Sequence, residues 1–173
     1  MSFTDIKTKD QGFTIVELLI VVVVIAILAA ITIVSYNGIT NRANASAASS
    51  LAASVGKKAE AYNAEESRYP LTTAELTGAA TSKSYNVATA AFLDGSTTNG
   101  APSASNGKTT VQLFRCQASG TATASSITAT TITGVRVAYW AFDASPAAIN
   151  YMKYGNTGTT SKTATAANCW VAN

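Results

Sequence analysis

The chain has 173 residues, of which 47% are hydrophobic and 12% charged, and its formal net charge is +3. The charged share is about half the roughly 25% of a soluble domain. Ala, Thr and Ser, by contrast, number 33, 25 and 17. A polar surface built from hydroxyls and not from charges suits an extracellular protein better than a cytosolic enzyme. Histidine is absent and there are two cysteines, so imidazole catalysis and a four-ligand zinc site are excluded.

A long apolar run lies near the N-terminus. Glu17 is the single charged residue between residues 11 and 41, and residues 18–34 read LLIVVVVIAILAAITIV. As a helix, residues 13–34 would measure about 33 Å, enough for the roughly 30 Å hydrocarbon layer of a bilayer. The sequence therefore predicts one membrane segment. The two leader lysines are offset by two aspartates, so the positive-inside rule favours a cytoplasmic N-terminus only modestly.

Glu17 interrupts the apolar pattern. A carboxylate inside a membrane helix is costly unless it has a partner. One interpretation places Glu17 among the lipid headgroups at the interface. The other requires a nearby positive charge, and Lys9 and Arg42 are too far away along the chain. A new N-terminus created just before Glu17 would supply that charge.

A short motif opens the apolar run. It reads Gly12-Phe13-Thr14-Ile15-Val16-Glu17. With the polar leader before it and the apolar run after it, the motif resembles the type III signal of type IV pilins and pseudopilins; the likeness covers residues 11–33 and is only architectural beyond them. The resemblance implies that prepilin peptidase cuts after Gly12 and that the new N-terminal residue, Phe13, is N-methylated. It also implies that Glu17 neutralises the terminal amine of an adjacent subunit.

Two other interpretations of the apolar run stay open. An ordinary secretory signal ends in an A-x-A site, and residues 43–45 and 45–47 both fit that pattern. The run is longer than the roughly 7–15 residues of such a signal, and a signal peptide does not explain the order Gly-Phe-Thr-Ile-Val-Glu. A plain single-span anchor is the second alternative.

The helical pattern continues beyond the membrane segment. Leu51, Val55 and Tyr62 recur at helical spacing, and Pro70 disfavours the helical conformation at the residue before it. We therefore predict one helix over residues 13–67, whose second half packs on a downstream element.

One departure from the family concerns the middle of this helix. Family members commonly carry a proline at the position of Val34, whereas the nearest helix-disfavouring residues here are Asn37 and Gly38. Either a melted turn over residues 35–38 or an unbroken helix is expected.

Strand signals follow a short turn. Thr72-Thr73-Ala74-Glu75 has the form of a capping box and predicts a short helical turn. Runs of β-branched and aromatic residues then predict strands over residues 109–116, 127–133, 135–142 and 149–154.

Alternation within the third predicted strand assigns its side chains to two faces. Val135, Val137 and Tyr139 lie on one face, and Arg136, Trp140 and Phe142 on the other. Ser145-Pro146 predicts a turn into an antiparallel hairpin with residues 149–154.

Together these elements predict an α+β fold in which an antiparallel sheet packs on the second half of a long N-terminal helix. We expect three parts: a leader of residues 1–12, a hydrophobic transmembrane or filament-core helix of residues 13–41, and a globular head of residues 42–173.

Cys116 and Cys169 are the two cysteines of the chain. Export favours an oxidised bridge between them, and closing so long a loop stabilises a fold by roughly 4 kcal/mol. Family members often carry a C-terminal disulfide. Two reduced, buried thiols are the alternative.

Other candidate sites carry weaker signals. Asp94 lacks the neighbouring oxygen ligands of a calcium loop, and neither a metal nor a cofactor is expected. Asn44 begins an Asn-X-Ser sequon, which its helical context makes a chance match. A group of aromatic residues forms either a binding patch or, as we favour, part of the core: Trp140, Phe142, Tyr151, Tyr154 and Trp170.

These patterns and the resemblance predict a structural subunit of a type IV pilus-like filament and not an enzyme. Expected partners are copies of itself in a helical homopolymer, prepilin peptidase, an assembly ATPase and a membrane platform protein. The precursor is expected in the cytoplasmic membrane and the product in a cell-surface filament; nucleic-acid binding, adhesion and motility stay open. The alternatives are a pseudopilin of type II secretion or DNA uptake and, outside the family, a membrane-anchored or secreted binding module.

Overall fold

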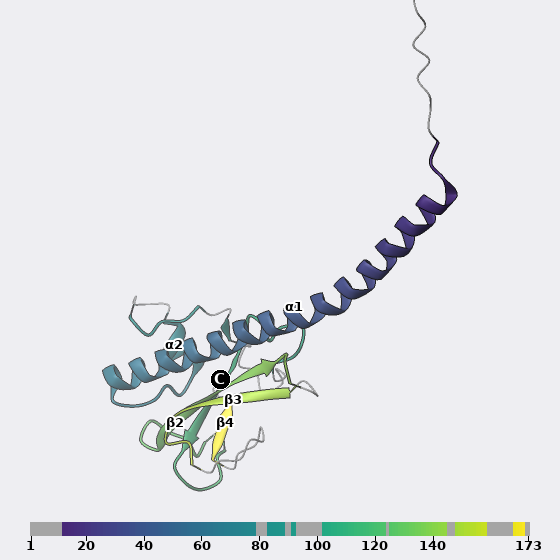
Figure 1. The fold of residues 1–173 in the computed structure, drawn as a ribbon. Helices are drawn as coiled ribbons and strands as arrows, with labels where there is room; N and C mark the ends of the chain where they lie inside the picture. Colours follow the sequence, from purple (N-terminus) through teal and green to yellow (C-terminus); the bar gives the residue numbers. More distant parts are fainter. Residues whose placement is uncertain are drawn as a thin grey trace, which may run out of the picture. The chain divides into compact units, whose positions relative to one another are not determined.

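A computed structural model describes residues 12–78, 83–88, 91–92, 102–123, 125–144, 148–158 and 168–171. The chain divides into two compact units, Met1–Thr40 and Asn41–Asn173. Helix α1 (Ile15–Glu66) has residues in both units, and the second unit also holds α2 (Thr73–Thr77) and a small sheet (Figure 1).

Helix α1 begins slightly later than predicted and ends close to the predicted residue. Residues 12–14 are not helical, so the helix starts at Ile15 instead of Phe13. It ends at Glu66 because Ser67 adopts a left-handed backbone conformation with φ of 58°, which ordinary residues rarely take inside a helix.

The middle of α1 is unbroken. Asn37 and Gly38 are both helical, and the Thr40 hydroxyl donates a hydrogen bond to the Tyr36 carbonyl at 2.9 Å. Of the two alternatives for residues 35–38, the structure has the continuous helix and not the melted turn.

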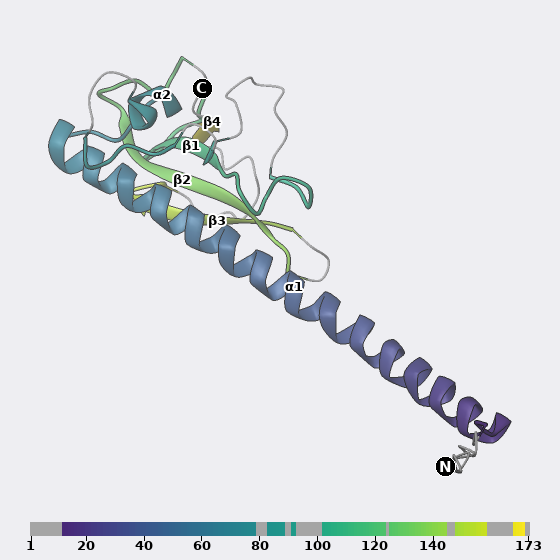
Figure 2. The same cartoon turned by 90° about the horizontal axis from the view of Figure 1, so that it is seen from above.

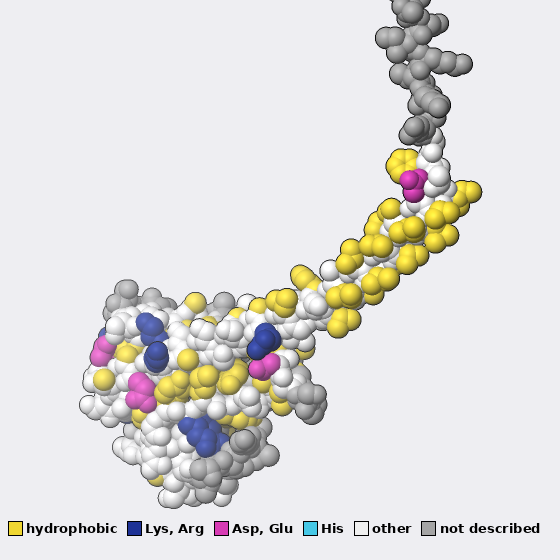
Figure 3. Space-filling view, in the orientation of Figure 1, with side chains coloured by type: hydrophobic (Ala, Val, Ile, Leu, Met, Phe, Trp, Pro, Cys, Tyr) yellow, Lys and Arg dark blue, Asp and Glu magenta, His cyan; other side chains and the backbone are white. Residues whose placement is uncertain are grey.

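The first unit presents apolar side chains to its surroundings. Its large hydrophobic residues from Phe13 to Ile39 are 47–87% exposed, and hydrophobic side chains cover the visible face of this part of the helix (Figure 3). Within the described ranges, α1 is the one helix long and apolar enough to cross a membrane, and its apolar window has no residue buried within the chain.

The second unit packs a sheet against a helix. Its four antiparallel strands are β1 (Gln112–Gln117), β2 (Ile132–Ala141), β3 (Ala148–Gly155) and β4 (Cys169–Val171), in the spatial order β3-β2-β1-β4. The C-terminal part of α1 runs along the sheet (Figure 2) and has Ala52, Val55 and Ala59 fully buried. The predicted α+β fold, a long helix on an antiparallel sheet, is confirmed.

The two faces of β2 bury different clusters, as the alternation predicts. Val135 and Val137 belong to the main core beneath α1, and Tyr139 packs against it. On the opposite face, Ala138 joins a smaller cluster with Phe114 and both cysteines. The predicted hairpin also forms, because β2 and β3 pair from Ala141↔Ala148 to Gly134↔Gly155 without a register shift.

Three of the five aromatic residues in the candidate patch contribute to core packing, the alternative that the sequence favours. Tyr154 and Trp170 pack on the main core, and Tyr151 packs on the smaller cluster. The Tyr151 ring meets Phe114 edge-on with 6.0 Å between centroids. Trp140 is half-buried.

The strand predicted over residues 127–133 is wrong for its first five residues. The Thr128 amide donates to the Thr131 hydroxyl at 2.8 Å, and the Thr123 amide donates to the Ser126 hydroxyl at 2.7 Å. Such short hydroxyl side chains compete with sheet hydrogen bonding. The segment therefore forms turns, and β2 begins only at Ile132.

The first strand is shorter than predicted at its start. It begins at Gln112 instead of Thr109, because the backbone amides of Thr109 and Thr110 both donate to the Asn106 carbonyl at 3.1 Å. These bonds form a turn before the ladder begins.

Helix α2 forms where the capping-box pattern predicts it, with different contacts. Thr72 is the N-cap residue, but its side chain makes no capping hydrogen bond. Glu75 instead accepts the Leu71 amide at 2.6 Å and the two terminal nitrogens of Arg68 at 2.8 and 3.1 Å. Burial raises the pKa of Glu75, but these hydrogen bonds outweigh it and hold the pKa below its usual value.

A second contact joins this segment to α1. The Tyr69 hydroxyl donates to Glu60 at 2.9 Å. Burial and this hydrogen bond to a carboxylate raise the pKa of Tyr69 to about 12.

Candidate functional site

The candidate cleavage junction lies just before α1. Gly12 and Phe13 are outside any helix, and the Phe13 side chain is 87% exposed. Among the described residues other than its chain neighbour, no heavy atom lies within 4 Å of the position that a Cβ on Gly12 would occupy. Proteases act on exposed, non-helical backbone, so the peptide bond between these residues has an accessible conformation. The rest of the proposed leader, residues 1–11, lies outside the described part of the chain.

Thr14 and Glu17 form a reciprocal cap at the start of α1. Glu17 Oε2 accepts hydrogen bonds from the Thr14 amide at 2.9 Å and from the Thr14 hydroxyl at 2.7 Å. In return, the Glu17 amide donates to Thr14 Oγ1 at 3.3 Å. The arrangement is a capping box, which satisfies amides that the first helical turn leaves without partners.

The cap gives Glu17 a partner that the sequence analysis did not consider. No Lys or Arg lies near Glu17 along the chain, but the partner of the carboxylate in the structure is an uncharged hydroxyl and amide. The available signal was the spacing of Thr14 and Glu17, since Thr followed three residues later by Glu is the capping-box pattern. The carboxylate is therefore positioned by its own helix before any neighbour is added.

Only one carboxylate oxygen takes part in the cap. Both hydrogen bonds from Thr14 reach Oε2, and within the described residues Oε1 of Glu17 accepts none. An exposed carboxylate with one committed oxygen can accept a further donor without losing its cap.

The family described as the prokaryotic N-terminal methylation motif matches residues 7–33, a segment that includes Gly12, Phe13 and the Thr14–Glu17 pair. The chain carries the methylation signal of type IV pilins and pseudopilins. The match is confined to this N-terminal segment of the chain. The motif implies processing by prepilin peptidase and handling by an assembly machinery. No solved structure matches the chain.

The second unit is closed by a disulfide. Cys116 and Cys169 face each other in the β1–β4 ladder and are bonded, with 4.1 Å between their Cα atoms. The bridge joins positions 53 residues apart and fixes the short edge strand β4 to β1. Of the two alternatives for these cysteines, the structure has the disulfide and not two reduced thiols.

The weaker candidate sites gain no support within the described residues. Asp94 lies outside the described residues, and within them no group of three His, Cys, Asp or Glu side chains could hold a metal ion. Asn44 is part of α1, in the helical context that the sequence analysis assumed.

Proposed function

We propose that this prepilin is a structural subunit of a type IV pilus-like filament. In this proposal, cleavage after Gly12 removes a leader of residues 1–12, and Phe13 becomes the N-methylated N-terminus. Residues 13–41 form the filament core, and residues 42–173 form the head. The observation that carries the proposal is the apolar surface of the first unit, whose large hydrophobic side chains are 47–87% exposed.

Such a surface needs lipid before assembly and sister helices after it. Moving between the two gives little hydrophobic gain, because lipid tails are as apolar as leucine side chains. Close packing and polar pairing must therefore set the register, while an assembly ATPase and a membrane platform protein supply work.

Glu17 supplies the polar pairing. Its Oε2 stays in the cap with Thr14, and its Oε1 accepts the methylated ammonium of Phe13 from a neighbouring subunit. A lone carboxylate and a lone ammonium are each unfavourable in a low-dielectric helical core, and their pairing satisfies both. The pairing thereby couples subunit register to assembly.

The head supports a location outside the cytoplasm. Disulfides persist in oxidising compartments, and Cys116 and Cys169 are bonded. We therefore place the precursor in the cytoplasmic membrane with its head outside, and the product in a cell-surface filament. The pseudopilin alternative shares all of these features, so the decisive property is whether extended filaments form on the cell.

Mass analysis of the mature N-terminus tests the processing. Methyl-Phe13 supports the proposal. Ser46 or Ala48 would indicate an ordinary secretory signal, and Met1 a simple anchor; each of these results contradicts the proposal. Immunogold labelling of the head should then decorate long surface filaments. Labelling confined to the cell envelope would favour a pseudopilin.

A further inference from the structure

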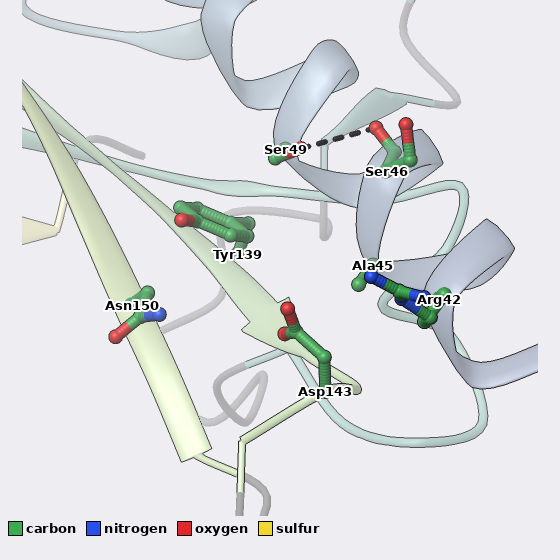
Figure 4. A pocket seen from close by; sticks show the side chains of 7 residues that line it. All are labelled: Arg42, Ala45, Ser46, Ser49, Tyr139, Asp143 and Asn150. Carbon is green, nitrogen blue, oxygen red and sulfur yellow. Dashed lines mark hydrogen bonds between the residues drawn. The ribbon is translucent and has the colours of Figure 1, made fainter. Parts of the chain in front are cut away.

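The second unit contains an open cavity of about 400 Å³ between the start of its helical segment and the sheet. Figure 4 shows polar side chains from both elements around it. Its polar lining consists of Arg42, Ser46 and Ser49 from α1, with Tyr139 and Asn150 from β2 and β3 and Asp143 from the turn after β2. Tyr139 and Asn150 are direct cross-strand neighbours, so the floor of the cavity is a fixed part of the sheet.

The cavity has one positive and one negative side chain, and they are not paired with each other. Ion pairs within 4 Å join Arg68 to Glu75 and Lys83 to Glu66 in the described part of the chain; Arg42 and Asp143 form no such pair there. Figure 4 shows Arg42 on the helix and Asp143 at the end of β2.

Four polar side chains of the cavity have unused hydrogen-bonding capacity within the described residues, whereas the Ser49 hydroxyl donates to the Ser46 carbonyl at 3.1 Å. The side chains of Arg42, Tyr139, Asp143 and Asn150 make no hydrogen bond there. Arg68 and Glu75, by contrast, satisfy each other near the far end of α1. A guanidinium donates up to five hydrogen bonds, a carboxylate accepts several, and the phenol and amide do both. The lining therefore matches a ligand that carries both charges and several polar atoms.

The sequence places Arg42, at one side of this cavity, just after the apolar run. Arg42 is the first cationic residue after the apolar run and follows Ile39 by three positions. The exposed apolar run continues to Ile39, and Arg42 follows Ile39 by about 4.5 Å of helix. Arg42 therefore belongs at the level of the lipid headgroups, where Arg and Tyr are favoured.

We propose that the cavity binds the headgroup of a zwitterionic phospholipid with a primary ammonium, as in phosphatidylethanolamine. Arg42 donates charge-assisted hydrogen bonds to the phosphate, and Asp143 accepts hydrogen bonds from the ammonium. Tyr139 and Asn150 supply neutral contacts between the two. The proposal rests on membrane insertion of the precursor and is independent of filament assembly.

The charge pattern selects among headgroups. A choline headgroup carries the same charges but has no N–H to donate to Asp143. A purely anionic headgroup meets Arg42 but is repelled by Asp143. The ethanolamine headgroup alone of these three satisfies both side chains.

The test uses the full-length precursor in mixed detergent micelles. The micelles contain equal amounts of phosphatidylethanolamine, phosphatidylcholine and phosphatidylglycerol with identical acyl chains, and native mass spectrometry counts the retained lipids. We expect about tenfold preference for phosphatidylethanolamine, the effect of one charge-assisted hydrogen bond. Asp143→Asn should remove that preference and raise phosphatidylglycerol retention, and Arg42→Gln should lower retention of all three. Lys57→Gln, which removes an exposed cation from the same helix outside the cavity, is the matched control.

Equal retention of the three lipids by the unmodified precursor would overturn the proposal, as would an unchanged preference in Asp143→Asn. A second contrary result has two parts: the unmodified precursor shows no lipid selectivity, and Arg42→Gln yields no filaments. Together they would indicate that the cavity binds a neighbouring subunit and not a lipid. Normal filaments combined with no lipid selectivity would overturn the headgroup site and leave the filament proposal intact.

Discussion

Thr14 and Glu17 cap each other at the first turn of α1, and they do so through a single carboxylate oxygen. Oε2 of Glu17 receives the Thr14 amide at 2.9 Å and the Thr14 hydroxyl at 2.7 Å, while the Glu17 amide returns a bond to Thr14 Oγ1 at 3.3 Å. Two roles of the glutamate, capping its own helix and pairing with a neighbour, therefore use different atoms and can be separated by mutation.

Removal of the Thr14 hydroxyl should fray the start of the helix. In Thr14→Val, the Glu17 amide loses its acceptor, and we expect it to exchange with solvent about fivefold faster in micelles, as for the loss of a typical N-cap. Hydrogen exchange followed by mass spectrometry measures this change.

Two variants control that measurement. Thr14→Ser keeps the hydroxyl and should restore slow exchange. Thr32→Val removes a hydroxyl that bonds to the Ala29 carbonyl at 2.9 Å in the same helix, so it should leave the Glu17 amide unchanged. An unaltered rate in Thr14→Val would show that the cap does not order the helix start.

Neutralising Glu17 should abolish assembly without removing the cap. Glu17→Gln retains a carbonyl oxygen that can accept from Thr14, but it has no negative charge for the Phe13 ammonium of a neighbour. We expect the variant to be membrane-bound, cleaved and methylated, yet to yield no filaments when sheared surface material is sedimented and imaged. Glu17→Ala should give the same result, and filaments from Glu17→Gln at the normal yield would disprove the pairing.

The parts of the fold that follow burial periodicity could be predicted from the sequence. Val135 and Val137 alternate with residues of the opposite face, and this pattern located the strand and its core face because a buried face tolerates only one register. Helix α1 was predictable for the same reason, since Val55 and Tyr62 repeat at helical spacing above the sheet.

Other features depend on competing hydrogen bonds and on tertiary packing, which the sequence pattern does not reveal. Thr128 and Thr131 have strand-like side chains, but the Thr131 hydroxyl bonds to nearby backbone and the Thr128 hydroxyl to neighbouring hydroxyls. Propensity alone does not decide between a strand and such a turn. The cavity beside Arg42 was unpredictable because Tyr139 reaches it only through the packing of β2 on α1. The cap of Glu17 was readable from its spacing to Thr14 and was missed because only charged partners were considered.

Loss of the disulfide should destabilise the head. In the Cys116→Ala, Cys169→Ala double variant, the free energy of unfolding should fall by about 4 kcal/mol according to the chain-entropy estimate for a loop of this length. Trp170 in β4 is the reporter. In the double variant, its emission should shift towards that of exposed indole at a lower urea concentration than in the unmodified protein. Reduction of the unmodified head in denaturant should reproduce the shift, and coincident unfolding curves would contradict a stabilising role.

Gly56 and Gly38 provide a matched pair of substitutions on one helix. A Cβ on Gly56 would overlap the Tyr154 ring, whereas among the described residues nothing outside the local helix backbone lies within 4 Å of a Cβ on Gly38. Gly56→Ala should therefore lower the free energy of unfolding of the head by about 1–3 kcal/mol through overpacking. Gly38→Ala should be neutral or should favour the helix by up to about 1 kcal/mol. Chemical denaturation of both variants in the same detergent gives the comparison, and equal stabilities would show that the Tyr154 ring moves aside freely.

The Arg68–Glu75 pair should make the head sensitive to acid. The pKa of Glu75 is lower in the folded chain than its usual value of 4.5, so the unfolded chain binds a proton more readily. The stability that this carboxylate contributes is present above pH 4.5 and is lost as the pH falls through the lower, folded pKa. Glu75→Gln should therefore unfold more easily at pH 7 and show a flatter dependence of stability on pH below 4.5. Glu65→Gln, which alters a carboxylate bonded to the Ser84 hydroxyl, is the control and should keep the acid dependence of the unmodified chain. If stability falls with pH below 4.5 in Glu75→Gln as steeply as in the unmodified chain, other carboxylates cause the acid sensitivity.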